Sequence, residues 1–267
     1  MVVFPNAKIN LGLTITEKRL DGYHNIESCF YPIPLVDALE VVESKKLSFT
    51  SSGISIPGNT DDNLCLKAYY LLKEKHNLPP VAIHLHKNIP IGAGLGGGSS
   101  DGAFMIKLLN DKFNLGESAD QMENMALKLG SDCPFFIRNE PLFVEGTGNL
   151  FSKINLELKG YFLALALPQI HVSTAQAYAG ITPKKPIINL KEVLENPDLG
   201  LWDSHIKNDF EYSVFKLHPS LAIIKNSLKK AGALYTSMTG SGSAVFGLFK
   251  TEPNIELAEP VKILRLT

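Results

Sequence analysis

The chain has 267 residues, enough for one large domain or two modest ones, and its 45% hydrophobic and 20% charged residues are typical of a globular protein. With 26 basic against 27 acidic side chains and no basic run, the sequence does not predict a nucleic-acid partner. The most apolar run, Tyr161–Leu167, is too short to cross a bilayer and the N-terminus shows no targeting segment, so no membrane partner is expected.

Strands dominate the first part of the chain. Alternating apolar and polar residues predict a strand over 8–16, and Asp21-Gly22 predicts a turn before a second strand over 26–33. Helical composition after an aspartate cap predicts a helix over 62–75. Further strands are expected over 38–43, 47–50 and 81–86.

Helices follow in the middle of the chain, over about 99–110 and 119–129. The second should begin with a capping box of Ser118 and Gln121 and end at Gly130. Strands are expected to return in the 140s.

The pattern starts again near 153–160, with a strand over 161–167 that ends before Pro168. Gly232 should end a helix, and the tail over 233–249 predicts a strand, a tight turn and another strand. We therefore expect two domains, residues 1–155 and 156–267. Candidate helices of the second domain lie near Thr174, Leu190, Asn208 and Pro219.

The most informative segment is Pro-Ile-Gly-Ala-Gly-Leu-Gly-Gly-Gly-Ser-Ser-Asp, residues 90–101. Residues without side chains let backbone amides converge on an anion, and a helix capped by Ser99 or Ser100 would add its free amides and its positive dipole end. The segment therefore predicts a phosphate-binding loop. Its expected contact residues are Pro90, Gly92, Gly94, Leu95, Gly96, Gly97, Gly98, Ser99 and Ser100.

Two other types of glycine-rich loop are alternatives for this segment. A nucleotide loop of the G-x-x-x-x-G-K-[ST] type is excluded, because Gly98 stands where its lysine belongs. Gly92, Gly94 and Gly97 do fit G-x-G-x-x-G, but Pro90 separates the loop from the preceding strand, which makes a dinucleotide site a poor alternative. A flexible surface loop is the plain alternative, although so many glycines are entropically costly.

Two segments offer groups for acid–base chemistry. Asp132 follows a helix stop and precedes Pro134 and two phenylalanines, so a carboxylate beside apolar bulk is a candidate base; the alternative is a residue that only turns the chain. Lys8 and Asn10 leave one face of a strand and could share a ligand, unless Lys8 is an ordinary edge lysine. The turn Thr239–Ser243 could present further amides to a phosphate.

Metal-ligand patterns are weak in this chain. Cys29, Cys65 and Cys133 are scattered, with no C-x-x-C spacing, which predicts neither disulfides nor a zinc site and is typical of a reducing cytoplasm. His84 and His86 share a strand face but lack a third ligand nearby, so no protein-held metal is predicted.

Five segments together resemble the GHMP small-molecule kinases, in matching order over about residues 4–249. They are Pro5–Leu11, Asp21–His24, Pro90–Ser100, Gly130–Phe135 and Thr239–Ser243. The first two resemble the branch of this family whose acceptor carries cytidine diphosphate. The resemblance implies an α+β fold with an N-terminal domain like ribosomal protein S5 domain 2 and a ferredoxin-like C-terminal domain.

The resemblance also implies a reaction and roles for residues. The activity would be ATP- and Mg²⁺-dependent phosphorylation of the 2-hydroxyl of diphosphocytidyl methylerythritol, in the non-mevalonate isoprenoid pathway, by a monomer or weak homodimer. Asp132 and Lys8 would be catalytic, and Asn10 would contact the acceptor. By the same resemblance, Tyr23, His24 and Tyr178 would hold the cytosine, with the two tyrosines as a sandwich, and Asn63 and Lys87 would lie near the adenosine.

The sequence departs from the family pattern at two places. Gly102 replaces the usual alanine, and the final helix and strand look abbreviated after Phe249. Two rival functions remain: a mevalonate or homoserine kinase, whose acceptors have no base to stack on Tyr23 and Tyr178, and a non-catalytic nucleotide-binding module, which would need no base such as Asp132.

Overall fold

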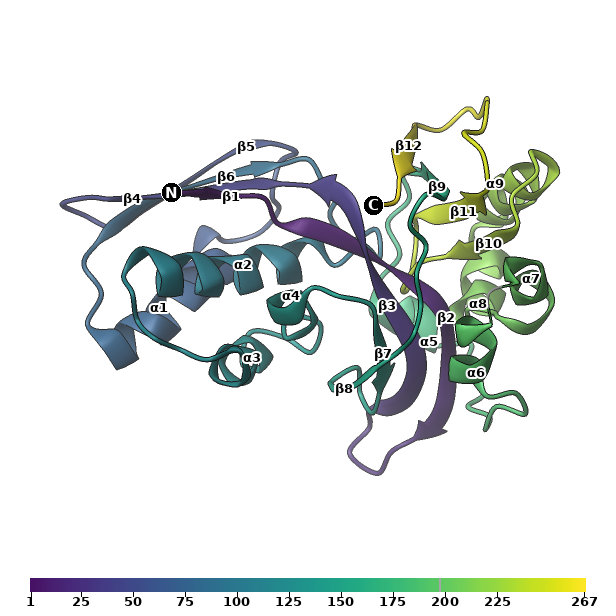
Figure 1. Cartoon of the computed structure of the whole chain (residues 1–267), viewed down its shortest axis with the longest axis horizontal. Coiled ribbons are helices and arrows are strands. Elements are labelled where there is room, and N and C mark those ends of the chain that lie inside the picture. Colours follow the sequence, from purple (N-terminus) through teal and green to yellow (C-terminus); the bar gives the residue numbers. More distant parts are fainter. Residues whose placement is uncertain (197) are drawn as a thin grey trace. The chain divides into compact units, whose positions relative to one another are not determined.

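The computed structural model describes residues 1–196 and 198–267, whose elements are labelled in Figure 1. By its internal contacts the chain forms two units, each built from several segments. The first unit contains 1–7, 35–91 and 96–140, and the second contains 8–34, 92–95 and 141–267. These units are discontinuous in sequence, whereas the expected domains, 1–155 and 156–267, are each one continuous segment. The expected domain boundary therefore stays a prediction.

One four-stranded sheet forms the first unit, in the order β1-β4-β6-β5. Strands β4 and β6 are antiparallel, whereas β5 runs parallel to β6. In β4, Leu39 and Val41 are buried while Glu40 and Val42 are exposed. Because side chains alternate along a strand, one face of the sheet therefore packs in the core. The strands are β1 (Val2–Val3), β4 (Ala38–Glu43), β5 (Ser48–Gly53) and β6 (Val81–Lys87).

Helices of the first unit pack on this sheet and on one another, and Figure 1 shows α1 and α2 side by side along it. A Cβ atom at Gly102 of α2 would lie 3.0 Å from that of Leu64, so the departure from alanine lets α1 and α2 approach closely. The predicted capping box of Ser118 and Gln121 is confirmed at the start of α3. The helices are η1 (Thr60–Asp62), α1 (Leu64–His76), α2 (Gly97–Lys112), α3 (Ala119–Leu127) and α4 (Phe135–Arg138).

Two further sheets belong mainly to the second unit, in the orders β2-β3-β7-β8 and β10-β11-β9-β12. The predicted hairpin at the start of the chain is confirmed as β2 and β3, although Asn6 and Ala7 of β2 and the last residues of β3 belong to the first unit. The strands are β2 (Asn6–Lys18), β3 (His24–Val36), β7 (Leu142–Glu145), β8 (Leu150–Lys153), β9 (Phe162–Ala166), β10 (Tyr235–Met238), β11 (Val245–Phe249) and β12 (Val261–Arg265).

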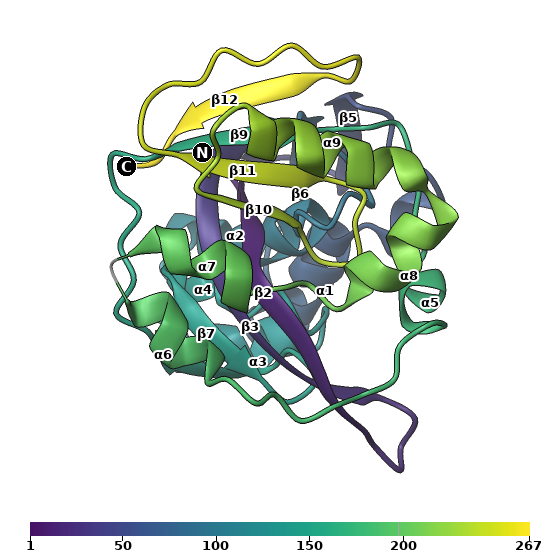
Figure 2. The ribbon, with the colours of Figure 1, turned by 90° about the vertical axis from the view of Figure 1, so that its right-hand side faces the viewer.

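The sheet β10-β11-β9-β12 carries helices on one face. Helix α9 packs on β10 and β11, as Figure 2 shows, and buries Leu221, Ile224 and Leu228 at helical spacing in the core of this unit. Strand β12 pairs with β9 and forms the sheet edge, so the final strand is present beyond Phe249. The helices are α5 (Thr174–Tyr178), α6 (Leu190–Glu195), η2 (Leu199–Leu201), α7 (Trp202–His205), α8 (Phe210–Leu217) and α9 (Pro219–Lys230).

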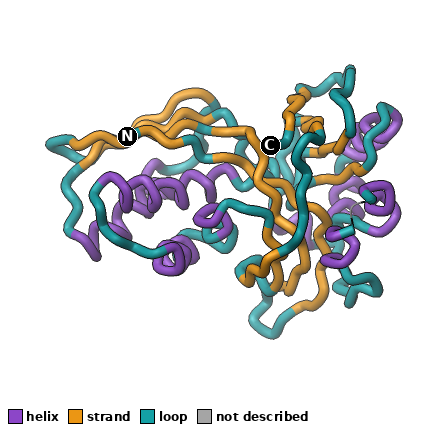
Figure 3. Tube along the Cα trace, viewed as in Figure 1, coloured by secondary structure: helices purple, strands orange, loops and turns teal. Residues whose placement is uncertain are grey.

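Both units contain runs of strands and runs of helices, and Figure 3 shows this mixture along the chain. The expectation of an α+β protein is confirmed. The short elements β1, α4 and α7 and the edge strand β12 were not predicted, because runs of two to five residues carry too little periodicity to detect. Within the described residues, no helix is both long and apolar enough to cross a membrane.

Candidate functional site

The glycine loop connects β6 to α2. Gly92, Gly94 and Gly96 have φ angles of 70°, 78° and 70°, in the left-handed region that other residues adopt only at a cost. Every second residue of the loop therefore requires glycine for a backbone reason. This alternation folds the loop tightly in front of the helix.

Helix α2 begins earlier than the sequence predicted. Its N-cap is Gly96, which makes no side-chain cap hydrogen bond, and neither Ser99 nor Ser100 is the cap. The backbone amide of Ser100 instead donates to the carbonyl of Gly96, at 2.9 Å, inside the first turn. The expectation of a serine cap is wrong because the left-handed Gly96 already ends the loop. The first amides of α2 are consequently not capped by a side chain, which is the arrangement that anion sites use.

Space and unpaired polar groups lie at this helix start. A Cβ atom at Gly98 would meet nothing within 4 Å, so the first turn is open on that side. The hydroxyl of Ser100 is buried and has no hydrogen-bond partner among the described residues. Both features suit an anionic ligand that supplies oxygen atoms.

The second unit supports the other half of the loop. The hydroxyl of Thr239 donates to the carbonyl of Gly94, at 3.1 Å, and the amide of Ala244 donates to that of Ala93, at 3.2 Å. A Cβ atom at Gly94 would lie 2.0 Å from the carbonyl oxygen of Thr239. The turn 239–243 therefore braces residues 93 and 94, a role that is more specific than presenting amides.

Asn208 holds that turn in place, a role that no pattern in the sequence indicated. Its side-chain amide is buried and donates to the carbonyls of Met238 and Gly240, at 2.8 Å each. Its oxygen accepts from the amide of Phe210, at 3.0 Å. A lone asparagine before a helix looks like an ordinary cap, so only the fold shows that it spans to the turn.

Lys8 and Asn10 do leave the same face of β2, as predicted. Both are buried, and the Lys8 ammonium donates to Asn10 Oδ1 at 2.5 Å and lies 4.6 Å from the centroid of the Phe30 ring. The Asn10 amide nitrogen donates to Ser28 Oγ at 2.9 Å, which fixes the orientation of the carboxamide. Lys8 is therefore not a solvated edge lysine.

Asp132 lies in the turn between α3 and α4, as the sequence predicted. It is half-buried and precedes Cys133, Phe135 and Phe136, which are fully buried and anchor the turn. Burial raises the pKa of the Cys133 thiol to about 12, so this neighbour stays protonated at neutral pH and offers no thiolate. Asp132 belongs to the first unit and Lys8 to the second, and their pairing stays a prediction.

Two of the aromatic residues expected at the cytosine site stack on each other. His24 stacks on Tyr178, with ring centroids 4.6 Å apart and an interplanar angle of 26°, while Phe210 meets Tyr178 edge-on at 4.7 Å. Tyr23 is 66% exposed in the turn before β3. Burial and Lys18 lower the pKa of His24, which keeps the stacked imidazole neutral. A sandwich of Tyr23 and Tyr178 stays a prediction.

Asn63 and Lys87, expected near the adenosine, already have partners in the first unit. Asn63 caps α1 by accepting the amide of Cys65 at 2.9 Å. Lys87 is 3% exposed, and its ammonium donates to Asp37 and to Asp101, the latter at 2.7 Å. The ammonium is thus engaged in the interior, and an adenosine contact for either residue stays a prediction.

Burial and the neighbouring charges both act on the ionisation of this cluster. Burial, together with the charge of Asp37, raises the pKa of Asp101 to about 7, whereas Lys87 opposes this rise. Burial alone would lower the pKa of Lys87, but the two carboxylates outweigh it and the pKa is raised. Lys87 therefore remains charged at neutral pH.

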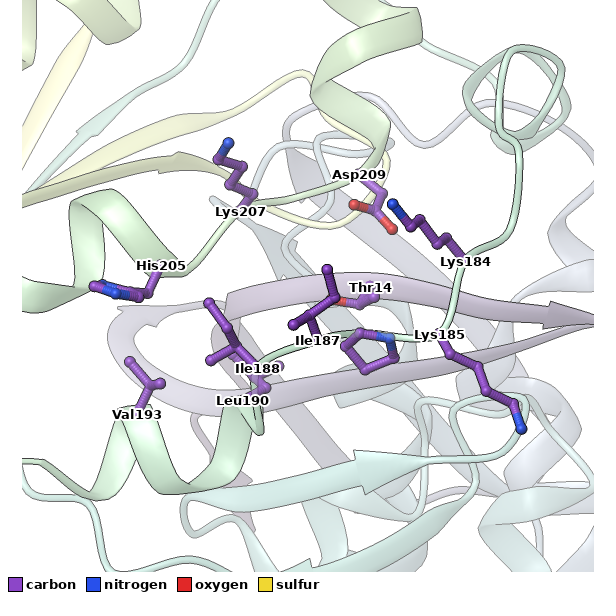
Figure 4. A pocket seen from close by; sticks show the side chains of 11 residues that line it. Thr14, Lys184, Lys185, Ile187, Ile188, Leu190, Val193, His205, Lys207 and Asp209 are labelled. Carbon is purple, nitrogen blue, oxygen red and sulfur yellow. The ribbon is translucent and has the colours of Figure 1, made fainter.

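One hollow in the second unit is lined by Thr14 and by residues between 184 and 209. It has a volume of about 240 Å³, and its floor includes Ile188, Leu190 and Val193. Figure 4 shows Lys185 and Lys207 extending away from it and Lys184 turned toward Asp209. None of the predicted site residues lines this hollow.

Among the described residues, no group of three or more histidine, cysteine or acidic side chains could hold a metal ion. His84 and His86 instead share hydrogen bonds with Ser52, at 2.9 and 3.0 Å.

Comparison with known proteins places this chain in a family. The model for the GHMP kinases N terminal domain matches residues 63–140, and the model for GHMP kinases C terminal matches 190–260. A 4-diphosphocytidyl-2-C-methyl-D-erythritol kinase from Bacteroides thetaiotaomicron is 55% identical over 256 residues, which cover 94% of this chain and 93% of that protein.

Solved structures agree with this likeness. The crystal structure of a 4-(cytidine 5'-diphospho)-2C-methyl-D-erythritol kinase has a TM-score of 0.77 and 30% identity, covering 93% of this chain and 90% of that one. The mevalonate kinase of Methanococcus jannaschii has a TM-score of 0.72 but only 18% identity, covering 100% of this chain and 98% of that one, and shows the fold alone.

The loop geometry predicts opposite effects for alanine at two of its glycines. Gly94→Ala should lower the free energy of unfolding by about 2 kcal/mol, because its φ is left-handed and its Cβ meets the Thr239 carbonyl. Gly98→Ala should raise stability by about 0.5–1 kcal/mol, since the site is helical and open, yet weaken nucleotide binding. Urea titrations and calorimetry measure both, and a fully stable Gly94→Ala protein would contradict the loop geometry.

Proposed function

The chain belongs to the GHMP kinase family, and on this premise we propose that it transfers the γ-phosphoryl group of ATP to the 2-hydroxyl of 4-diphosphocytidyl-2-C-methyl-D-erythritol, giving the 2-phosphate and ADP. The likeness to kinases of this substrate over nearly the whole chain is the observation that carries the proposal. The reaction belongs to non-mevalonate isoprenoid synthesis. We place the enzyme in the cytoplasm, as a monomer or weak homodimer acting on a small molecule.

The glycine loop suits the ATP phosphates. Phosphoryl transfer depends mainly on positioning and on charge stabilisation, which backbone amides and a helix N-terminus provide. The uncapped start of α2, the open side of Gly98 and the unpartnered Ser100 hydroxyl fit an anionic ligand there. Pro90 and Leu95 would shape the loop, and Leu95 also accepts the backbone amide of Lys8 at 2.9 Å.

Mg²⁺ bound with ATP would neutralise charge on the transferred phosphoryl group. The described residues contain no acidic cluster that would hold the ion alone, which fits a cation that arrives with the nucleotide. The chain's part is to orient phosphate oxygens with the amides of the first turn of α2 and to leave room beside Gly98.

Asp132 and Lys8 take the catalytic roles in this proposal. The Asp132 carboxylate accepts the proton of the acceptor hydroxyl, and the Lys8 ammonium stabilises the charge that develops on the attacking oxygen. Asn10 contacts the methylerythritol part, with its carboxamide held by Lys8 and Ser28. Because the Asn10 orientation is fixed in advance, little order has to be gained when the acceptor binds.

The cytidine part of the acceptor is assigned to Tyr23, His24 and Tyr178. The stacked rings of His24 and Tyr178 form an aromatic surface, and the exposed Tyr23 directly precedes His24 in the sequence. Base stacking tolerates any base, so selection of cytosine would come from hydrogen bonds near His24. The cytosine base distinguishes the proposed acceptor from mevalonate and homoserine, which carry no base to stack on these aromatic residues.

An acceptor panel tests the proposal directly. Purified protein with ATP and Mg²⁺ should release ADP in the presence of 4-diphosphocytidyl-2-C-methyl-D-erythritol and not with mevalonate or homoserine, because only the first carries a base for the aromatic group. Product mass and ³¹P NMR should show a phosphate on the 2-hydroxyl. Turnover with another acceptor would reassign the substrate, and ATP binding without any turnover would favour a nucleotide-binding module.

Replacing the proposed base should affect chemistry more than binding. Asp132→Asn should lower kcat by about 10²–10⁴, the usual effect of losing a general base, while the Kd for ATP changes little. Asp111→Asn, at an exposed position of α2, is the control and should behave as the wild type. Near-normal kcat in a folded Asp132→Asn protein would reject this role.

Stacking predicts a contrast at Tyr178. Tyr178→Ala should weaken binding of cytidine diphosphate by roughly fivefold to more than a hundredfold, since one stacked base is worth about 1 to 3 kcal/mol. Tyr178→Phe keeps the ring and should be nearly silent. Titrations with cytidine diphosphate and with ATP measure the two sites separately. An equal loss for both nucleotides would mean that Tyr178 only packs the core.

A further inference from the structure

A buried ionic cluster lies in the first unit directly behind the glycine loop. It consists of Lys87, the last residue of β6, with Asp37 and with Asp101 of α2. All three are almost fully buried, with exposed fractions of 3%, 1% and 3%. The ammonium donates to one oxygen of each carboxylate. None of these side chains reaches solvent, so the cluster's effect must pass through the backbone around it.

The cluster holds the upstream end of the loop. The second oxygen of Asp37 accepts the backbone amides of Asn88 and Ile89, at 2.6 and 2.9 Å. The side chain of Asn88 donates to the carbonyl of Val36, at 3.1 Å. The chain is therefore fastened at two consecutive amides immediately before Pro90, where the loop leaves β6.

The same cluster holds the downstream end. Asp101 lies in α2 shortly after its start at Gly97 and bonds to the same ammonium. A Cβ atom at Gly97 would lie 3.3 Å from Lys87 Nζ and 2.8 Å from Ile89 Cγ2, so the helix start packs on the cluster and on the upstream anchor. One ammonium thus sets the distance between the two ends of the loop.

Stability alone does not account for this arrangement. A buried cluster of two carboxylates and one ammonium has a large desolvation cost, and an apolar replacement is often as stable. Asp101 Oδ1 has no hydrogen-bond partner among the described residues, which adds to the cost. The loop between the anchors contains three left-handed glycines and would be mobile without them.

Resting on the proposed function, we propose that Lys87, Asp37 and Asp101 are positioning residues, which clamp both ends of the loop 88–97 so that its amides are ordered before ATP binds. The Lys87 ammonium then acts on the phosphates through the loop. Preorganised amides bind an anion better because ordering them at the moment of binding costs free energy.

The chain supplies a matched control for this proposal. Glu117, 7% exposed in the first unit, accepts hydrogen bonds from Lys75 and His76, so its buried carboxylate is the centre of a second ionic cluster. The hydrogen-bond partners of Glu117 among the described residues lie outside the glycine loop. Its backbone amide and carbonyl both bond to the side chain of Asn110. Glu117→Gln should therefore lower stability without changing nucleotide binding.

The kinetic test compares three variants with the wild type. Asp37→Ala removes both the ionic contact and the acceptor for the two amides, and should raise the KM for ATP by roughly tenfold or more, with the KM for the acceptor nearly unchanged. Asp37→Asn keeps an oxygen for the amides and should recover most of the affinity. Glu117→Gln should keep both KM values. A merely structural role would instead reduce the folded fraction of Asp37→Ala and leave both KM values as in the wild type.

Hydrogen–deuterium exchange gives a readout that needs no turnover. Without nucleotide, Asp37→Ala and Asp101→Asn should exchange the amides of peptide 88–101 faster than the wild type, whereas Asp37→Asn and Glu117→Gln should not. The conservative Asp101→Asn variant covers the case in which Asp37→Ala does not fold. Unchanged exchange in 88–101 would overturn the clamp. Failure of the wild type to use the proposed acceptor would reject the proposed function and leave the exchange result standing.

Discussion

Left-handed backbone at Gly92, Gly94 and Gly96 is the constraint on which the rest of the site depends. Such a loop has no intrinsic preference for one shape, because glycine populates many backbone conformations before folding. Its conformation must come from the surroundings. Within the second unit Thr239 contacts Gly94, and within the first unit the start of α2 packs on the Lys87 cluster. A flexible segment becomes a defined one without any side chain of its own.

Buried polar groups do most of this holding. Asn10, Asn208 and Thr239 are nearly inaccessible to solvent, and their hydrogen bonds connect β2, the start of α8 and the turn 239–243. A buried amide is costly unless its bonds are made, so each of these side chains has one permitted geometry. The same hydrogen bonds therefore position strand β2, which carries Lys8 and Asn10, and the turn 239–243, which contacts Gly94. Apolar packing alone would leave their relative register much less defined.

The proposed chemistry divides between rigid and accessible parts. Lys8 and Asn10 are buried and oriented, whereas Asp132 is half-buried on a turn and Tyr23 is exposed. Oriented groups suit stabilisation of developing charge, and an accessible carboxylate can meet a hydroxyl that arrives with the acceptor. The stacked pair of His24 and Tyr178 lies between these extremes, because it is ordered by ring packing but belongs to short elements. The family comparison and this division point to the same kind of reaction.

By itself, the sequence determined the glycine loop, the strand face shared by Lys8 and Asn10, the turn of Asp132 and the capping box of Ser118, because glycine density, strand period and cap spacing are local signals. Together with its motifs, it also indicated the family. Only the tertiary structure showed that Gly96 is the N-cap of α2, that Asn208 holds the turn 239–243, and that His24 stacks on Tyr178. It also showed that Lys87 lies between Asp37 and Asp101. These four arrangements join residues whose partners are set by packing of the whole chain, and no local pattern records such partners.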